Sequence, residues 1–249
     1  MRPAKARPSG QSSAKRLDFG RSRLQPAATL WKKGAFSTPQ TLLCFGDSNT
    51  HGTLPITSPN VRARYDAATR WPRVTLARLG PDWDLVEEGL PGRTAQFEDP
   101  VMGAFMDGRP GLRIALQSHG PIDIMTLMLG TNDVKTRFGA TARKVTAGIA
   151  GLLDIALGDE MQARHGGFKV LLICPPPVKE VGLLAGEFFG ARAVSLALPA
   201  LYAELAAARR VGFLDAGQLI EVSETDGVHY EENAHAALGK AVAEALATL

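Results

Sequence analysis

The chain has 249 residues, 45% hydrophobic and 21% charged, which is enough to bury the core of one α/β domain. The net charge of +3 is uneven: residues 1–39 contain nine Lys and Arg against the single acid Asp18, so the remainder is mildly acidic. No apolar run reaches the ~18 residues of a membrane span and no signal-peptide core is present, so we expect a soluble, cytoplasmic protein with no membrane span.

Residues 1–39 are rich in Ser, Arg, Lys and Pro and show no hydrophobic periodicity. This composition predicts a flexible basic extension, followed by one domain over residues 40–249. An organelle transit peptide and a start codon assigned too far upstream are alternatives for the same segment. Aromatic residues are sparse and no recognition motif is present, so we expect no nucleic acid partner.

From Thr41 onward, short apolar runs bounded by Gly, Pro or Asp alternate with helical patterns, as expected of strands buried on both faces. Strands are predicted at residues 41–45, 83–87, 122–129, 169–174 and 211–214. Helices are predicted at residues 68–79, 140–164, 191–209 and 233–248. This alternation predicts a parallel five-stranded sheet with helices on both faces, and functional sites in such sheets lie at the carboxyl ends of the strands.

The two cysteines, Cys44 and Cys174, lie within predicted strands. We interpret both as small core residues and expect no disulfide. The sequence contains neither a His-Glu-x-x-His nor a Cys-x-x-Cys spacing, so we expect no metal and no cofactor. Three histidines, His119, His165 and His235, stand in polar contexts and are predicted to lie at the surface.

Polar segments follow three of the predicted strands and precede the last helix. They are Gly46-Asp47-Ser48-Asn49, the run through Gly92, Gly130-Thr131-Asn132-Asp133, and Asp226-Gly227-Val228-His229. Each has an ordinary structural interpretation: Ser48 as a helix cap, His229 as a loop histidine and Asn132 as a turn residue. Together they place a hydroxyl, an imidazole, a carboxylate and a carboxamide at one edge of the sheet. These groups are the components of an acyl-transfer site.

In this order the four segments resemble the signature blocks of the SGNH (GDSL-like) hydrolases, and the resemblance extends from about Thr41 to Leu249. The flanking sequence is similar to the arylesterase and acyltransferase branch of that family. Asn49 stands where many relatives have Leu. The resemblance implies a flavodoxin-like three-layer α/β/α sandwich, the SGNH hydrolase fold. It also implies assembly into a homo-oligomer.

The resemblance implies that Ser48 is the nucleophile, that His229 is its general base and that Asp226 orients the imidazole. It implies an oxyanion hole made by the N–H groups of Ser48 and Gly92 and the side-chain amide of Asn132. The expected reaction is hydrolysis of small aryl or short-chain acyl esters through an acyl-enzyme, with acyl transfer to alcohols as a second outcome. Alternatives are a carbohydrate O-deacetylase, a thioesterase, a lysophospholipase and a non-catalytic ligand-binding module.

The segments 53–70 and 175–190 are expected to form the walls of the substrate pocket. We predict that His51, Leu54 and Phe188 contribute to substrate binding. Subunit contacts are an equally good interpretation of the apolar residues in these segments. Asp47 and Asp133 are predicted to hold loops through bonds from backbone N–H groups.

Overall fold

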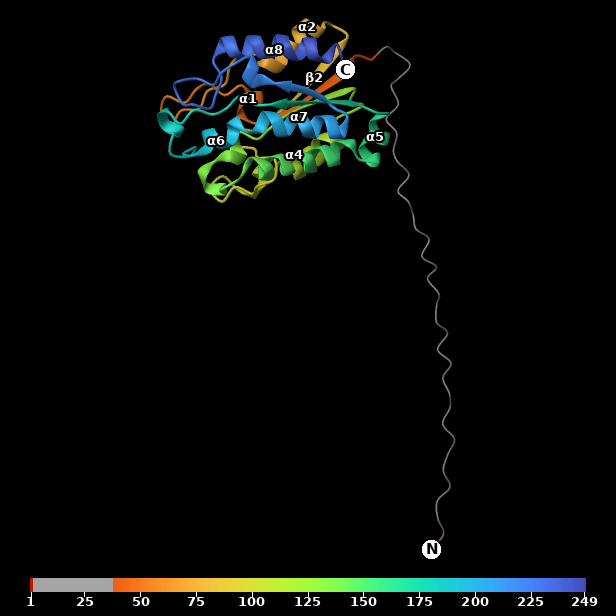
Figure 1. Ribbon diagram of the computed structural model, residues 1–249. Helices are drawn as coiled ribbons and strands as arrows, with labels where there is room; N and C mark the ends of the chain where they lie inside the picture. Colours follow the sequence, from red (N-terminus) through yellow and green to blue (C-terminus); the bar gives the residue numbers. More distant parts are fainter. Residues whose placement is uncertain (2–37) are drawn as a thin grey trace.

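The computed structural model describes residue 1 and residues 38–249 (Figure 1). The flexible extension predicted at residues 1–39 lies outside the described residues, apart from its two ends. The domain predicted from residue 40 begins where the first strand begins.

Five parallel strands form one sheet in the order β2-β1-β3-β4-β5. Their bounds are β1 (Gln40–Gly46), β2 (Trp83–Gly89), β3 (Ile124–Met128), β4 (Lys169–Cys174) and β5 (Gly212–Asp215). All five predicted strands are present, with ends that differ by up to two residues. The strand order is that of flavodoxin-like proteins, which confirms the predicted fold class.

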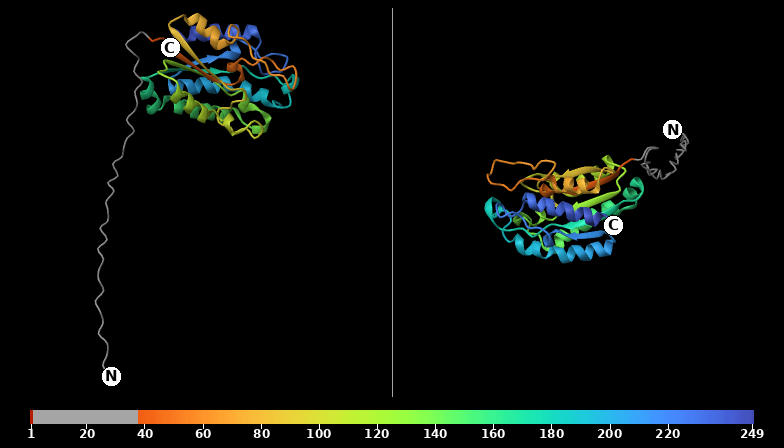
Figure 2. Two further views of the ribbon diagram at one scale, coloured as in Figure 1. Left: turned by 180° about the vertical axis from the view of Figure 1, so that it is seen from behind. Right: turned by 90° about the horizontal axis from the view of Figure 1, so that it is seen from above.

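Both faces of the sheet are covered because successive residues of a strand point to opposite sides. In β1, Leu43 and Phe45 pack into one core, whereas Leu42 and Cys44 pack into the other. The layers are visible in Figures 1 and 2, with α8 and α2 above the sheet and α4 and α7 below it in Figure 1. In the run TLLCF, Thr41 is partly buried and the four residues from Leu42 to Phe45 are fully buried, as expected of a strand covered on both faces.

Helices connect the strands and supply the two outer layers. The α-helices are α1 (Ser48–His51), α2 (Trp71–Leu79), α3 (Gly108–Ser118), α4 (Ala142–Leu157), α5 (Asp159–His165), α6 (Ala191–Leu196), α7 (Leu198–Arg209) and α8 (Glu232–Leu246). Short 3-10 helices are η1 (Ala104–Met106), η2 (Asn132–Val134), η3 (Thr136–Phe138), η4 (Gly182–Leu184) and η5 (Ala216–Gln218).

Two predicted helices are each divided in the structure, and two helices, the four-residue α1 and the longer α3, were not predicted. The pattern at 140–164 is interrupted at Gly158, where the backbone leaves the helical region, and α5 begins again at Asp159. The pattern at 191–209 is interrupted at Ala197, because Pro199 occupies the first turn of a new helix. Helix α3 escaped prediction because its first turn contains Gly and Pro residues, although Asp107 caps it by accepting from the N–H of Arg109 at 3.0 Å.

The segment Ala191–Arg209, divided between α6 and α7, is long and apolar enough by length and composition to cross a membrane. In the fold, Leu198, Tyr202 and Ala206 of this segment belong to the core beneath the sheet. The apolar character of the segment thus has a packing role here.

The prediction of buried cysteines is confirmed: Cys44 and Cys174 are both fully buried and free. The surface prediction for His165 and His235 is wrong, because both are buried. Each ring accepts a backbone N–H from a neighbouring element, His165 from Ile122 at 3.2 Å and His235 from Trp71 at 3.3 Å. The imidazoles therefore join elements inside the fold, which a polar local sequence does not reveal.

Candidate active site

Ser48 lies at the sharp turn between β1 and α1, at the carboxyl edge of the sheet. Asp47 caps α1, since its Oδ1 accepts the N–H of Asn49 at 2.9 Å. Gly46 permits the turn, because a Cβ there would come within 2.0 Å of Thr50 Oγ1. As the first residue of a helix, Ser48 has a backbone N–H without an intrahelical acceptor.

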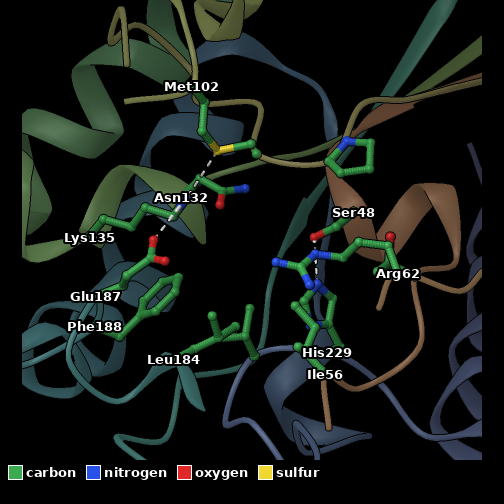
Figure 3. Close-up of a pocket in the computed structure, with 14 residues that line it drawn as sticks. Ser48, Ile56, Arg62, Met102, Asn132, Lys135, Leu184, Glu187, Phe188 and His229 are labelled. Carbon is green, nitrogen blue, oxygen red and sulfur yellow. Dashed lines mark hydrogen bonds and ion pairs between the residues drawn. The ribbon is translucent and has the colours of Figure 1, made fainter. Parts of the chain in front are cut away.

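A chain of hydrogen bonds connects Ser48 to Asp226 through His229 (Figure 3 labels Ser48 and His229). His229 Nε2 lies 3.1 Å from Ser48 Oγ, and His229 Nδ1 lies 2.6 Å from Asp226 Oδ2. All three residues are buried. The structure brings together residues that are separated by more than 170 positions in the sequence.

The three-residue spacing of Asp226 and His229 follows from the local turn. Asp226 Oδ1 accepts the N–H groups of Val228 and His229, each at 3.0 Å, and Gly227 adopts φ 76°. Oδ2 also accepts the N–H of Ile56 at 2.7 Å. One carboxylate thus forms the turn, ties it to the segment after α1 and faces the imidazole.

Opposing effects act on the Asp226 carboxyl. Burial raises its pKa, but the hydrogen bonds and charge of His229, with the N–H of Ile56, outweigh burial and hold the pKa below its ordinary value. Asp226 is therefore ionised at neutral pH. An ionised carboxylate beside Nδ1 keeps the proton on that nitrogen, so Nε2 is free to accept the proton of Ser48.

Three hydrogen-bond donors expected to form an oxyanion hole lie at one cavity. Ser48, Gly92 and Asn132 all line it, together with His229. Gly92 has φ 91°, a conformation that favours glycine, and a Cβ there would lie 2.4 Å from the Met102 side chain. Asn132 Nδ2 is 3.0 Å from the carbonyl oxygen of Arg93 and 3.4 Å from Asp47 Oδ2.

The cavity has a volume of about 110 Å³, and Figure 3 shows the side chains around it. Both predicted wall segments contribute, together with neighbouring loops. Its lining residues are Ser48, Thr53, Ile56, Arg62, Pro91, Gly92, Met102, Asn132, Lys135, Leu184, Glu187, Phe188, Val228 and His229.

Of the residues predicted to contribute to substrate binding, Phe188 lines the cavity, but His51 and Leu54 do not. His51 Nδ1 instead lies 3.0 Å from Thr53 Oγ1, and the Leu54 N–H donates to the carbonyl of Ala63 at 3.0 Å. These contacts shape the loop after α1 rather than the cavity, so both assignments are corrected.

Sequence reasoning missed several wall residues. Met102 comes from the segment between β2 and α3, which was assigned to no wall because it shows no strand or helix pattern. Lys135 lies two residues after the predicted segment Gly130-Thr131-Asn132-Asp133, and this proximity in the sequence is the signal that could have identified it. Glu187 lies in the predicted 175–190 wall, where the prediction of a substrate pocket rests on apolar side chains and gives no signal for a carboxylate.

Two further carboxyls lie behind the cavity. Burial raises the pKa of Asp47 to about 6 and that of Asp133 to about 7. Both oxygens of Asp133 lie 2.9 Å from the N–H of Ala95, so this side chain holds the loop that contains Gly92. Asp47 and Asp133 thus hold loops in the predicted manner. Within the described part of the chain, no three His, Cys, Asp or Glu side chains gather as a metal ion would require.

Comparisons with known proteins agree with this geometry. Residues 44–237 match the model of the GDSL-like lipase/acylhydrolase family. A carbohydrate acetylesterase from Sinorhizobium meliloti is 34% identical with a TM-score of 0.79, and the aryl esterase of M. smegmatis is 33% identical with a TM-score of 0.80. A putative arylesterase from Agrobacterium tumefaciens is 36% identical with a TM-score of 0.75. Each match covers 84% of this chain and 99% of the other. No curated protein matches the chain.

Proposed function

This chain belongs to the GDSL-like lipase/acylhydrolase family and is a carboxylic ester hydrolase, and from that membership we propose that it hydrolyses small aryl or short-chain acyl esters through an acyl-enzyme on Ser48. The observation that supports this proposal is the hydrogen-bonded chain from Ser48 Oγ through His229 to Asp226. A ligand-binding module needs no such chain.

In the first half of the proposed reaction, Ser48 Oγ attacks the ester carbonyl carbon while His229 Nε2 takes the hydroxyl proton. The new C–O bond gives a tetrahedral oxyanion. As this intermediate collapses, the bond to the alcohol oxygen breaks and His229 returns the proton to the departing alcohol. Asp226 stabilises the imidazolium throughout.

In the second half, a water attacks the acyl carbon of the acyl-enzyme and His229 takes a proton from it. Collapse of the second tetrahedral intermediate releases the carboxylic acid and returns the proton to Ser48 Oγ. In both halves the oxyanion lies against the N–H groups of Ser48 and Gly92 and the amide of Asn132, which stabilise charge that develops only during the reaction.

The size of the cavity supports a short acyl group. Its volume of about 110 Å³ is well below the roughly 300–1,000 Å³ of pockets that enclose drug-sized ligands. Apolar side chains of Ile56, Leu184 and Phe188 line it. An acetyl or another short acyl group, or a flat aryl group, suits this space better than the long chain of a lysophospholipid.

We also propose acyl transfer to alcohols as a second outcome at the same site. The acyl-enzyme reacts with whichever hydroxyl reaches its carbonyl carbon, and the apolar lining favours the alkyl part of an alcohol over water. The measurement is the ratio of transferred ester to free acid when aryl acetate is supplied with a short alcohol in water. Formation of free acid alone at every alcohol concentration would remove this second outcome.

The test of the proposed function is substitution of the nucleophile. Ser48→Ala is expected to lower kcat for p-nitrophenyl acetate by three orders of magnitude or more, because removal of one member of such a triad has about this cost in serine hydrolases. A fluorophosphonate probe is expected to label the wild-type protein at Ser48 and to leave the variant unlabelled. The matched control is Ser118→Ala, an exposed serine at the end of α3, which retains labelling and turnover. Full activity in Ser48→Ala would refute the nucleophile assignment.

A further inference from the structure

A buried ammonium group lies in the wall of the cavity. Lys135 follows η2, three residues after Asn132, and its side chain is only 6% exposed. Lys135 lines the same cavity as Ser48 and His229, on the side of the drawn pocket away from them (Figure 3). None of the roles proposed above uses this charge.

The contacts of the Lys135 ammonium within residues 38–249 are weak. The group has three N–H donors. Its hydrogen-bond partner is the sulfur of Met102 at 3.7 Å, which is a poor acceptor, and Glu187 Oε2 lies 3.8 Å away, beyond hydrogen-bond distance. The Phe188 ring centre is 6.0 Å from Nζ. Burial lowers the pKa of Lys135, with the charge of Glu187 acting in the opposite direction.

A second lysine shows what a well-paired ammonium looks like in this fold. Lys179 Nζ lies 2.6 Å from Glu221 and 2.5 Å from Glu224, and both acids are exposed. Lys135 is more deeply buried but has no carboxylate this close. A buried charge usually has strong partners, so its weak pairing here indicates that its donors are directed at something that enters the cavity.

Glu187 places an acceptor beside this donor. Its Oε2 also accepts a hydrogen bond from Arg137, which in turn contacts Asp99 Oδ1 at 3.3 Å, so Arg137 holds the carboxylate in place. Because Lys135 Nζ and Glu187 Oε2 are 3.8 Å apart, one oxygen atom can lie about 2.8 Å from both. A hydroxyl oxygen at that point would accept from the ammonium and donate its hydrogen to the carboxylate.

We propose that Lys135 and Glu187 are a specificity-determining pair that binds a hydroxyl group of the ester substrate. The inference rests on the proposed esterase function, because it concerns the ester held in the same cavity. A neutral hydroxyl satisfies both members of the pair. A carboxylate group on the substrate would satisfy Lys135 but would be repelled by Glu187, and an unsubstituted alkyl or aryl group would satisfy neither.

The test compares two esters that differ only in hydroxyl groups, glycerol 1-acetate and propyl acetate. Binding is measured by NMR titration in the Ser48→Ala background, which holds the ester without turning it over. Adding Lys135→Met is expected to weaken binding of glycerol 1-acetate relative to propyl acetate about tenfold or more, the cost of a hydrogen bond to a charged group. Glu187→Gln is expected to lower the ratio of the two affinities, that for glycerol 1-acetate divided by that for propyl acetate, about threefold. The control Lys240→Met, on the exposed face of α8, leaves the ratio unchanged.

Three results would overturn the pair. One is an equal loss of affinity for both esters in Lys135→Met, and another is no binding of glycerol 1-acetate by Ser48→Ala. The third is a change in the affinity for monoethyl succinate, an ester that carries a carboxylate. If Lys135→Met binds it more weakly and Glu187→Gln binds it more tightly than the parent protein, the pair recognises a carboxylate and not a hydroxyl. If Lys135→Met does not fold, as judged by circular dichroism, the ratio in Glu187→Gln decides, because that side chain is 46% exposed. Failure of the proposed function is separate: it appears as absent turnover and labelling in the wild-type protein.

Discussion

The carboxylate of Asp226 links the backbone of two loops to the imidazole of His229. It accepts N–H groups from Ile56, Val228 and His229 and faces the imidazole nitrogen Nδ1. A residue with four such contacts orients the ring and holds the loop at the same time. The three-residue spacing follows from this arrangement, because the same carboxylate accepts the backbone N–H of His229 and faces its ring.

Kinetic measurements can distinguish two roles for Asn132, stabilisation of the oxyanion and binding of the substrate. Its amide donates to the Arg93 carbonyl at 3.0 Å, and a second N–H faces Asp47 only at the long distance of 3.4 Å. The weakly held N–H is available to a developing oxyanion. Asn132→Ala is therefore expected to lower kcat for aryl acetates by roughly 10²–10³. A raised KM with kcat unchanged would assign Asn132 to substrate binding.

His235 makes the stability of the fold depend on pH. Burial lowers its pKa to about 4, against an ordinary value of 6.5. As the pH falls through about 6.5 the unfolded chain binds a proton that the folded protein refuses until about pH 4. Above pH 6.5 the neutral His235 ring therefore costs the folded state nothing. As the pH falls from 6.5 to 4, the free energy of unfolding decreases progressively, by on the order of 3 kcal/mol.

The prediction for His235 is checked by urea unfolding of the wild-type protein and His235→Gln at pH 7.5 and pH 4.5. The variant is less stable at pH 7.5, because the ring accepts the Trp71 N–H. Its free energy of unfolding nevertheless falls less between the two pH values. Equal losses in the two proteins would show that His235 does not contribute to the acid dependence.

Among the elements, α2 and α8 pack closely against each other, and α8 follows the Asp226–His229 turn in the chain. Gly239 of α8 lies against α2, and its carbonyl accepts the hydroxyl of Thr75 at 3.1 Å. A Cβ at Gly239 would lie 2.6 Å from the Cβ of Val74 and 2.8 Å from the carbonyl of Trp71. The two helices approach this closely because position 239 has no side chain.

Gly239→Ala is expected to destabilise the protein by about 1–3 kcal/mol, because the helices must separate or distort to admit the methyl group. The matched control is Gly151→Ala in α4, where nothing lies within 4 Å of an added Cβ. That change is expected to stabilise the protein by about 0.5–1 kcal/mol through helix propensity. Thermal unfolding of both variants measures the difference. If both substitutions stabilise, the α2–α8 contact tolerates a side chain and the interpretation fails.

The elements could largely be predicted because buried strands have a distinctive composition. Each of the five strands coincides with an apolar run, and Leu42 to Phe45 need partners on both faces. Helix α3 was missed because Pro110 and Gly111 obscure its periodicity, and the pause at Gly158 was missed because apolar spacing continues across it. Sequence pattern predicts a helix poorly when Gly or Pro occupies its first turn, because whether these residues are accepted there depends on the capping interaction.

At the scale of the whole molecule, the strand order explains why the site can form. Ser48 and the segments through Gly92 and Asn132 follow β1, β2 and β3, and these strands are neighbours in the sheet. The Asp226–His229 segment follows β5 in the chain, and β5 is the strand at the far edge of the sheet. It returns to Ser48 and is anchored there by Asn49, whose side chain donates to the Val228 carbonyl at 3.1 Å.

Removal of residues 1–39 tests whether the remaining chain is sufficient. In the part of the chain that the structure describes, the sheet begins at Gln40, and the cavity and both cores consist of later residues. Tm and esterase turnover are therefore expected to be nearly unchanged in the shortened protein. The control is the full chain prepared in parallel. A large fall in either quantity would show that the removed segment packs on the domain.

The sequence by itself determined the alternation of strands and helices, because buried runs depend on neighbours in the chain. It also contained the four polar segments whose resemblance to a known family implied the residues proposed for catalysis. Only the tertiary structure decided which side chains surround the substrate cavity. Met102, Lys135 and Glu187 come from three separate loops, and the burial of His235 depends on helices far apart in the sequence. Such contacts follow from how loops pack over the sheet, which no local pattern records.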